Sequence, residues 1–129
     1  MIAADDVELT RALERCEPPS AGFPHASHLR VAWVYLNESA SVAEALARMG
    51  DTLRLFAASV GHAGKYSDRI TAFWMYQMAA AHAVMPTAAF DDVVRAFPRL
   101  LDKELIAVTP RAADPSGDPS DRAVSRRPA

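Results

Sequence analysis

The sequence of 129 residues has one cysteine, few glycines and almost no net charge. The single cysteine, Cys16, excludes a disulfide within the chain and any zinc site built from several thiolates. A formal net charge of −2 gives no electrostatic reason to expect binding to nucleic acid or to an anionic membrane. The sequence also lacks a glycine-rich phosphate loop, the Gly-x-Ser-x-Gly pattern of serine hydrolases, and the His-Glu-x-x-His and Glu-x-x-His patterns of metal enzymes.

Long apolar runs are missing as well. The longest candidate, residues 70–85, is interrupted by Gln77 and His82 and is too short to span a bilayer. The first nine residues carry Asp5, Asp6 and Glu8 and no apolar stretch, which is unlike a secretory signal. Together with the lone cysteine, these features predict a cytoplasmic protein.

Hydrophobic residues make up half of the sequence, alanine is abundant, and the prolines fall in clusters. Alanine and leucine favour helix, whereas clustered prolines mark helix ends. We therefore predict a single all-α domain, residues 1–109, folded as a bundle of four to six helices. Residues 110–129 are rich in Pro, Ser, Asp and Arg and are predicted to form a disordered tail.

Apolar spacing and capping residues predict where the helices lie. Ser41 and Glu44 form a capping box in which each side chain is expected to bond the backbone amide of the other residue. Ser67 or Asp68 is expected to cap the fourth helix, and Thr87 the fifth. The second helix is apolar on most sides and should be central. The predicted ranges are 6–16, 25 or 26 to 36, 42–60, 69–85, 88–97 and a short helix opening at Pro98.

His25 and His28 lie three residues apart at the start of the second predicted helix, so their rings should face the same way. The positive end of the helix dipole should lower both pKa values and keep the rings neutral. A neutral imidazole is the form required of a general base or a metal ligand. The alternative is structural: one ring bonds a backbone group and the other is exposed.

A second polar cluster, Lys65 to Arg69, lies at the start of the fourth predicted helix. A bundle can bring this cluster next to the two histidines. Tyr66 is then expected to donate a proton or a hydrogen bond, and Asp68 to orient an imidazole. The alternative is that Ser67 caps the helix, Asp68 complements its dipole and Tyr66 packs.

Trp33, Thr71, Trp74 and Gln77 are predicted to form the wall of a pocket for a small molecule. The same aromatic residues are equally compatible with a simple core. His82 is expected to be a hydrogen-bonded core histidine. His62 would join the other histidines only if the loop after Gly61 folds back.

Three stretches of the sequence, in this order and spacing, carry a resemblance. They are Phe23-x-His25-x-x-His28-Leu29-x-x-Ala32-Trp33-x-Tyr35-Leu36, then Lys65-Tyr66-x-x-x-Ile70-Thr71, then Pro98-Arg99-Leu100-Leu101-Asp102. Together they resemble a family of small, poorly characterised, all-helical bacterial proteins. Its members show Phe-x-His-x-x-His-Leu-x-x-Ala-x-x-Tyr-Leu, then Lys-Tyr-His-x-Thr-Ile-Thr, then Pro-x-Leu-Leu-Asp.

The resemblance implies a third histidine in the second motif, but Ser67 stands at that position. Asp68 stands where the family often has an acid, and Arg69 replaces a threonine. If the family site holds a metal, this chain lacks one of its ligands. His25, His28 and Asp68 would remain as three candidate metal ligands.

We therefore expect a small-molecule-binding helical protein that acts as an acid–base enzyme of bacterial specialised metabolism. In this hypothesis His25 or His28 is the base, and no cofactor is required. One alternative is a metal-binding protein that uses His25, His28 and Asp68. Another is a non-catalytic interaction module whose fourth helix packs against a second copy, as a homodimer, or against another partner.

Overall fold

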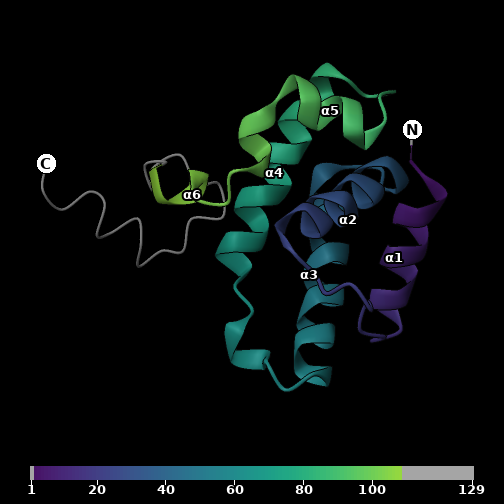
Figure 1. Cartoon of the computed structure of the whole chain (residues 1–129), viewed down its shortest axis with the longest axis vertical. Coiled ribbons are helices and arrows are strands. Elements are labelled where there is room, and N and C mark those ends of the chain that lie inside the picture. Colours follow the sequence, from purple (N-terminus) through teal and green to yellow (C-terminus); the bar gives the residue numbers. More distant parts are fainter. Residues whose placement is uncertain (1, 109–129) are drawn as a thin grey trace, which may run out of the picture.

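The computed structural model describes residues 2–108, which form helices joined by short turns, with no strand among them (Figure 1). This confirms the predicted all-α class. The predicted tail, 110–129, lies outside the described residues. None of the helices in the described part combines the length and the apolar character needed to cross a membrane. The helices are α1 (Ala4–Glu14), α2 (His25–Glu38), α3 (Val42–Ser59), the 3-10 turn η1 (Ala63–Lys65), α4 (Asp68–Val84), α5 (Phe90–Ala96), the 3-10 turn η2 (Pro98–Leu101) and α6 (Leu105–Val108).

Helix α2 is the centre of the bundle, as its apolar pattern predicts. Every residue from Val31 to Leu36 is buried, and α2 contacts α1, α3 and α4. Figure 1 shows α3 and α4 side by side, with the chain reversing direction at the loop between them. Helix α4 is also buried on more than one side, from Thr71 to Met75 and again at Met78 and Ala81. Helices α2, α3 and α4 therefore pack against one another, and this packing sets the relative position of the starts of α2 and α4.

The helix caps agree with the sequence in two places and differ in two. Ser41 accepts a hydrogen bond from the amide of Glu44 at 3.1 Å, and Ser67 accepts one from the amide of Ile70 at 3.2 Å. The Glu44 carboxylate reaches the amide of Ala40 rather than that of Ser41. The prediction for Thr87 is wrong, because α5 begins two residues later than predicted, with Ala89 at its N-cap position and no side-chain cap.

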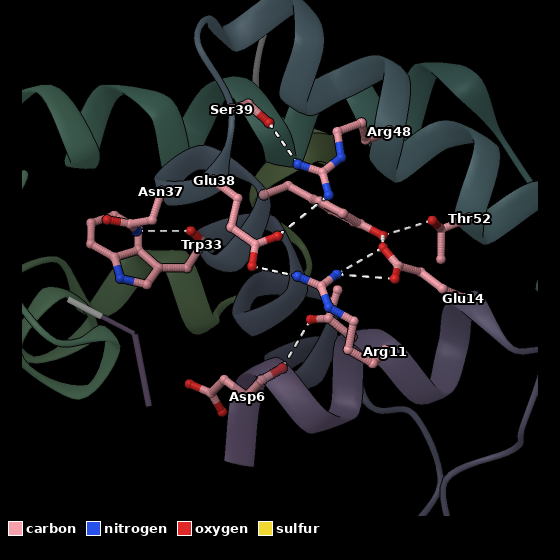
Figure 2. Close-up of polar contacts among 11 residues, drawn as sticks. Asp6, Arg11, Glu14, Trp33, Asn37, Glu38, Ser39, Arg48 and Thr52 are labelled. Carbon is pink, nitrogen blue, oxygen red and sulfur yellow. Dashed lines mark hydrogen bonds and ion pairs between the residues drawn. The ribbon is translucent and has the colours of Figure 1, made fainter. Parts of the chain in front are cut away.

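A connected set of polar side chains joins α1, α2 and α3 (Figure 2). The fully buried Tyr35 donates its hydroxyl proton to Glu14 at 2.6 Å, so the Thr52 hydroxyl, 2.7 Å away, must be the donor to Tyr35. Arg11 contacts both Glu14 and Glu38. We call this set, completed by Arg48, the α1–α2–α3 polar network; its members are Arg11, Glu14, Tyr35, Glu38, Arg48 and Thr52.

The ionisation of the network follows from its contacts. Burial alone would raise the pKa of Glu14, but hydrogen bonds from Tyr35 and Arg11 outweigh it and lower the pKa. Burial and the bond to Glu14 raise the pKa of Tyr35. The carboxylate therefore stays charged and the phenol stays protonated, which keeps the donor and acceptor roles fixed.

Candidate functional site

A groove of about 590 Å³ opens between α2, α3 and α4, where the two histidines of α2 face the loop that precedes α4. Its volume lies within the range of small-molecule pockets. Most of its wall is apolar, with polar groups at a few points. The lining residues are Phe23, His25, His28, Met49, Leu53, Phe56, Ala57, Val60, His62, Lys65, Tyr66, Ser67, Ile70, Thr71, Trp74, Lys103 and Ile106.

His28 is held in one tautomer. Its Nδ1 lies 3.2 Å from the carbonyl oxygen of Pro24, and because a carbonyl can only accept, Nδ1 carries the proton. The Phe23 ring stacks on the imidazole with ring centroids 3.9 Å apart. Burial lowers the pKa of His28 and the nearby His25 lowers it further, while the bond to Pro24 opposes this. At neutral pH the ring is therefore uncharged and Nε2 has a free lone pair.

His25 is held in the opposite sense. Its Nε2 lies 2.9 Å from the carbonyl oxygen of Leu100, so Nε2 carries the proton. Its ring meets that of Trp74 edge to face, with centroids 4.4 Å apart. His25 thus connects the start of α2 to η2 and supports the wall of the groove. Of the two histidines, His28 presents the better-defined proton acceptor.

Tyr66 lies between this groove and a second, smaller hollow of about 370 Å³, and it lines both. Burial raises the pKa of Tyr66, a hydrogen bond with Thr71 lowers it, and one with Asp68 raises it again, so that the phenol stays protonated. A Cβ added at Gly50 would lie 3.2 Å from the Tyr66 hydroxyl. The close approach of Tyr66 therefore leaves little room for a side chain at this position of α3.

Asp68 lines the smaller hollow and not the groove. Its exposed carboxylate accepts a hydrogen bond from Arg54 at 2.8 Å, and the Arg54 guanidinium also lies over the Tyr66 ring, 5.5 Å from its centroid. The structure thus places Asp68 with Arg54, on the far side of Tyr66 from the histidines. Of the two alternatives that the sequence offers for Asp68, this position in the first turn of α4 agrees with the one in which the carboxylate complements the helix dipole.

The predicted wall residues divide among three environments. Thr71 and Trp74 line the groove. Trp33 is fully buried in the core and meets His82 edge to face, with centroids 5.0 Å apart. Gln77 lines a separate hollow with Val84 and Phe97. These positions separate because α4 turns Gln77 away from the face that Thr71 and Trp74 share.

His62 joins the groove because the loop after α3 does fold back. Gly61 has a φ of +79°, the left-handed region that favours glycine. The amide of Gly61 donates to Ala58 and that of His62 to Ala57, a Schellman motif that ends the helix and reverses the chain. The sequence signal for this turn was Gly61 itself.

Several lining residues were not predicted from the sequence as part of a site. Met49, Leu53 and Phe56 come from the apolar stripe of α3, which also serves the core, so their spacing could not separate the two uses. Lys103 and Ile106 reach the groove from the segment after η2. A pairing so distant in sequence leaves no local pattern.

Among residues 2–108, no group of three or more His, Cys, Asp or Glu side chains is placed to hold a metal ion. The ligand set His25, His28 and Asp68 is not assembled, because Asp68 is paired with Arg54 instead. A neutral imidazole with a free Nε2 in a mostly apolar groove can accept a hydrogen bond or a proton from such a molecule.

Comparisons of the chain with protein-family models, with curated proteins and with solved structures found no match.

Proposed function

We propose that this protein binds an organic small molecule in the groove between α2, α3 and α4, and that His28 acts on it as a general base. The observation that carries the proposal is convergence. His25 and His28 of α2, His62 of the loop after α3, and Tyr66 and Thr71 at the start of α4 line one groove whose remaining wall is mainly apolar. An apolar cleft with a few convergent polar groups is the usual form of a small-molecule site.

The roles follow from the hydrogen bonds. Nδ1 of His28 donates to Pro24, which leaves Nε2 to accept a proton from an O–H or an acidic C–H of the ligand. The lowered pKa keeps this nitrogen unprotonated at neutral pH. Tyr66, protonated and in contact with Thr71, is the candidate donor on the opposite wall. Trp74 and Phe56 provide flat apolar surfaces for the body of the ligand.

A thermal-shift screen of metabolites tests binding. A ligand at a hundredfold excess over its Kd should stabilise the protein by about 2.7 kcal/mol. Hits are then measured by calorimetry with wild type, with His28→Gln and with His82→Gln. The last is the matched control, because His82 contacts Trp33 outside the groove lining. We expect His28→Gln to weaken binding and His82→Gln to leave it unchanged.

Base catalysis is tested by proton exchange in D₂O. For a hit with a C–H next to a carbonyl group, NMR should show deuterium replacing that hydrogen faster with wild type than with His28→Gln. The exchange rate should fall as the pH drops below the pKa of His28, because the protonated imidazole cannot accept. Equal exchange by wild type and His28→Gln would contradict the role of His28. Failure of every compound to bind would contradict the proposal as a whole.

An interaction module is a second candidate, favoured by one observation. Val84, Phe97 and Leu101 are exposed apolar side chains, and the first two line the hollow that contains Gln77. Light scattering tests this candidate directly. A dimer at micromolar concentration that Val84→Glu converts to a monomer would support it. A monomeric wild-type protein would rule out self-association as the function.

A further inference from the structure

We propose that the ligand of the groove is an apolar organic acid, whose negative charge is bound by Lys65 and Lys103. This inference rests on the proposed function and specifies its ligand class. It starts from an asymmetry in the sequence. The chain has fourteen lysines and arginines in all, and only two of them are lysines, Lys65 and Lys103. Both line the groove, and no arginine does.

The lysines come from separate parts of the chain. Lys65 ends η1, in the loop between α3 and α4, and Lys103 lies between η2 and α6. Both lysines line the groove and remain exposed to solvent. Two positive groups that line one groove, from positions 38 residues apart in the sequence, make it favourable for a negatively charged ligand.

The groove holds no compensating negative charge. Its lining residues include no aspartate and no glutamate. Asp68, the acid next in sequence to the lining residues of α4, is paired with Arg54 in the other hollow. Within the described part of the chain, the ion pairs join carboxylates to arginines, and neither Lys65 nor Lys103 takes part in one. The two ammonium groups are thus available to a ligand.

The interior of the groove selects the rest of the molecule. Met49, Leu53, Phe56, Ile70 and Trp74 line it, so the body of the ligand must be apolar. His28 accepts through Nε2 and therefore does not repel a negative group as a carboxylate would. An apolar ligand that carries one acidic group would match both the apolar lining residues and the two lysines.

Matched pairs of probes test this inference: benzoate and benzamide, 2-naphthoate and 2-naphthamide, decanoate and decanamide. Each pair keeps the body and removes the charge. Binding is followed by calorimetry and by tryptophan fluorescence, since Trp74 lines the groove. A charge-assisted hydrogen bond is roughly twice as strong as a neutral one, so we expect at least one acid to bind about tenfold more tightly than its amide.

Variants then locate the charge. Lys65→Met/Lys103→Met should abolish the preference for the acid without abolishing binding of the body. Lys65→Arg/Lys103→Arg keeps both charges and should keep the preference. Arg95→Met removes one exposed positive charge on α5, outside the groove lining, and serves as the control for net charge. Added salt should weaken the acid and not the amide.

The outcomes separate the two proposals. Equal binding of acid and amide by wild type overturns the acid inference and leaves the proposed small-molecule site intact. A preference that persists in the double methionine variant also overturns it. If none of the six probes binds, the acid inference is overturned, whereas the proposed small-molecule site is judged separately by the thermal-shift screen of metabolites.

Discussion

The two ends of α2 place their polar groups in opposite situations. Towards its C-terminus, Tyr35 and Glu38 belong to the α1–α2–α3 polar network, where donors and acceptors satisfy one another (Figure 2). Towards its N-terminus, His25 and His28 each use one ring nitrogen on a backbone carbonyl, and both residues line the groove. The first arrangement stabilises the fold. The second keeps a proton acceptor available.

This difference separates two kinds of side chain that sequence patterns treat alike. A buried polar group with a complete set of partners contributes to stability, and removing a partner leaves a costly unpaired group. A half-buried group with one free lone pair contributes less to folding and more to binding. Substitutions should therefore act on stability at one end of α2 and on binding at the other.

The largest effect on stability is expected from Tyr35→Phe. It removes the hydroxyl between Glu14 and Thr52 and leaves both without that partner, at a cost of about 1–3 kcal/mol. Chemical denaturation measures this, with Thr52→Val and the double variant completing a cycle. The two side chains should couple by more than about 0.5 kcal/mol. Additive effects would show that the network does not act as a unit.

Acid should lower the free energy of unfolding in two pH windows, one set by His28 and one by Glu14 of the polar network. The pKa of His28 is lowered from 6.5, so below about pH 6.5 the unfolded chain takes up a proton that the folded chain does not, and stability falls. The pKa of Glu14 is lowered from 4.5, so its contribution is present above that pH and is lost as the pH falls below it. Unfolding measured from pH 8 to pH 3 should therefore show two separate declines.

Variants assign each window. His28→Gln should reduce the decline that begins near pH 6.5, and Glu14→Gln the one below pH 4.5. His82 also has a pKa lowered by burial, so His82→Gln is measured alongside to separate its share of the upper window. An unchanged profile in His28→Gln would mean that the burial of this imidazole has no thermodynamic consequence.

At neutral pH, His28→Gln should change the free energy of unfolding by less than about 1 kcal/mol, because the ring is only half-buried and makes one hydrogen bond to Pro24. Its effect on ligand binding should be larger than its effect on folding. A loss of several kcal/mol in stability would instead make His28 a structural residue, like Tyr35.

Asp68→Asn should have a small effect on both properties. The Asp68 carboxylate is exposed and paired with Arg54, and such surface pairs contribute about 0–1 kcal/mol. Since Asp68 does not line the groove, binding in the groove should be unchanged. A large loss of binding would restore the sequence-based hypothesis that Asp68 orients an imidazole.

The smallest net effect is expected from Gly50→Ala. Alanine favours helix over glycine by about 1 kcal/mol, but its Cβ would lie 3.2 Å from the Tyr66 hydroxyl and push that side chain away. The two effects should nearly cancel in unfolding experiments. A gain of the full propensity difference would show that Tyr66 moves without cost.

The sequence was informative where a local pattern decides the structure. The central position of α2 followed from its apolar faces, and the caps at Ser41 and Ser67 followed from residue type. Thr87 failed as a cap because the turn after α4 runs to Ala89 before α5 begins. A single threonine near a helix start does not fix which residue takes the capping position.

The site was harder to predict, because contacts between distant segments decide it. The three-residue spacing of His25 and His28 correctly predicted that they lie together, and the turn at Gly61 explains why His62 reaches the groove. Whether Asp68 pairs with an imidazole or with Arg54 depends on contacts between separate helices, and the sequence holds no sign of the pair with Arg54. The entry of Lys103 from beyond η2 is equally invisible locally. Lysine usage across the whole chain was the one available signal.

The most direct test of the proposed site is a long-range ¹H–¹⁵N NMR spectrum of the four histidines at pH 7, recorded without and with 2-naphthoate. The structure predicts that His28 is neutral, with its proton on Nδ1 and an unprotonated Nε2 whose shift moves on addition of the ligand. His82 should not respond. A doubly protonated His28, or a ligand response confined to His82, would contradict the proposal that this groove is the functional site.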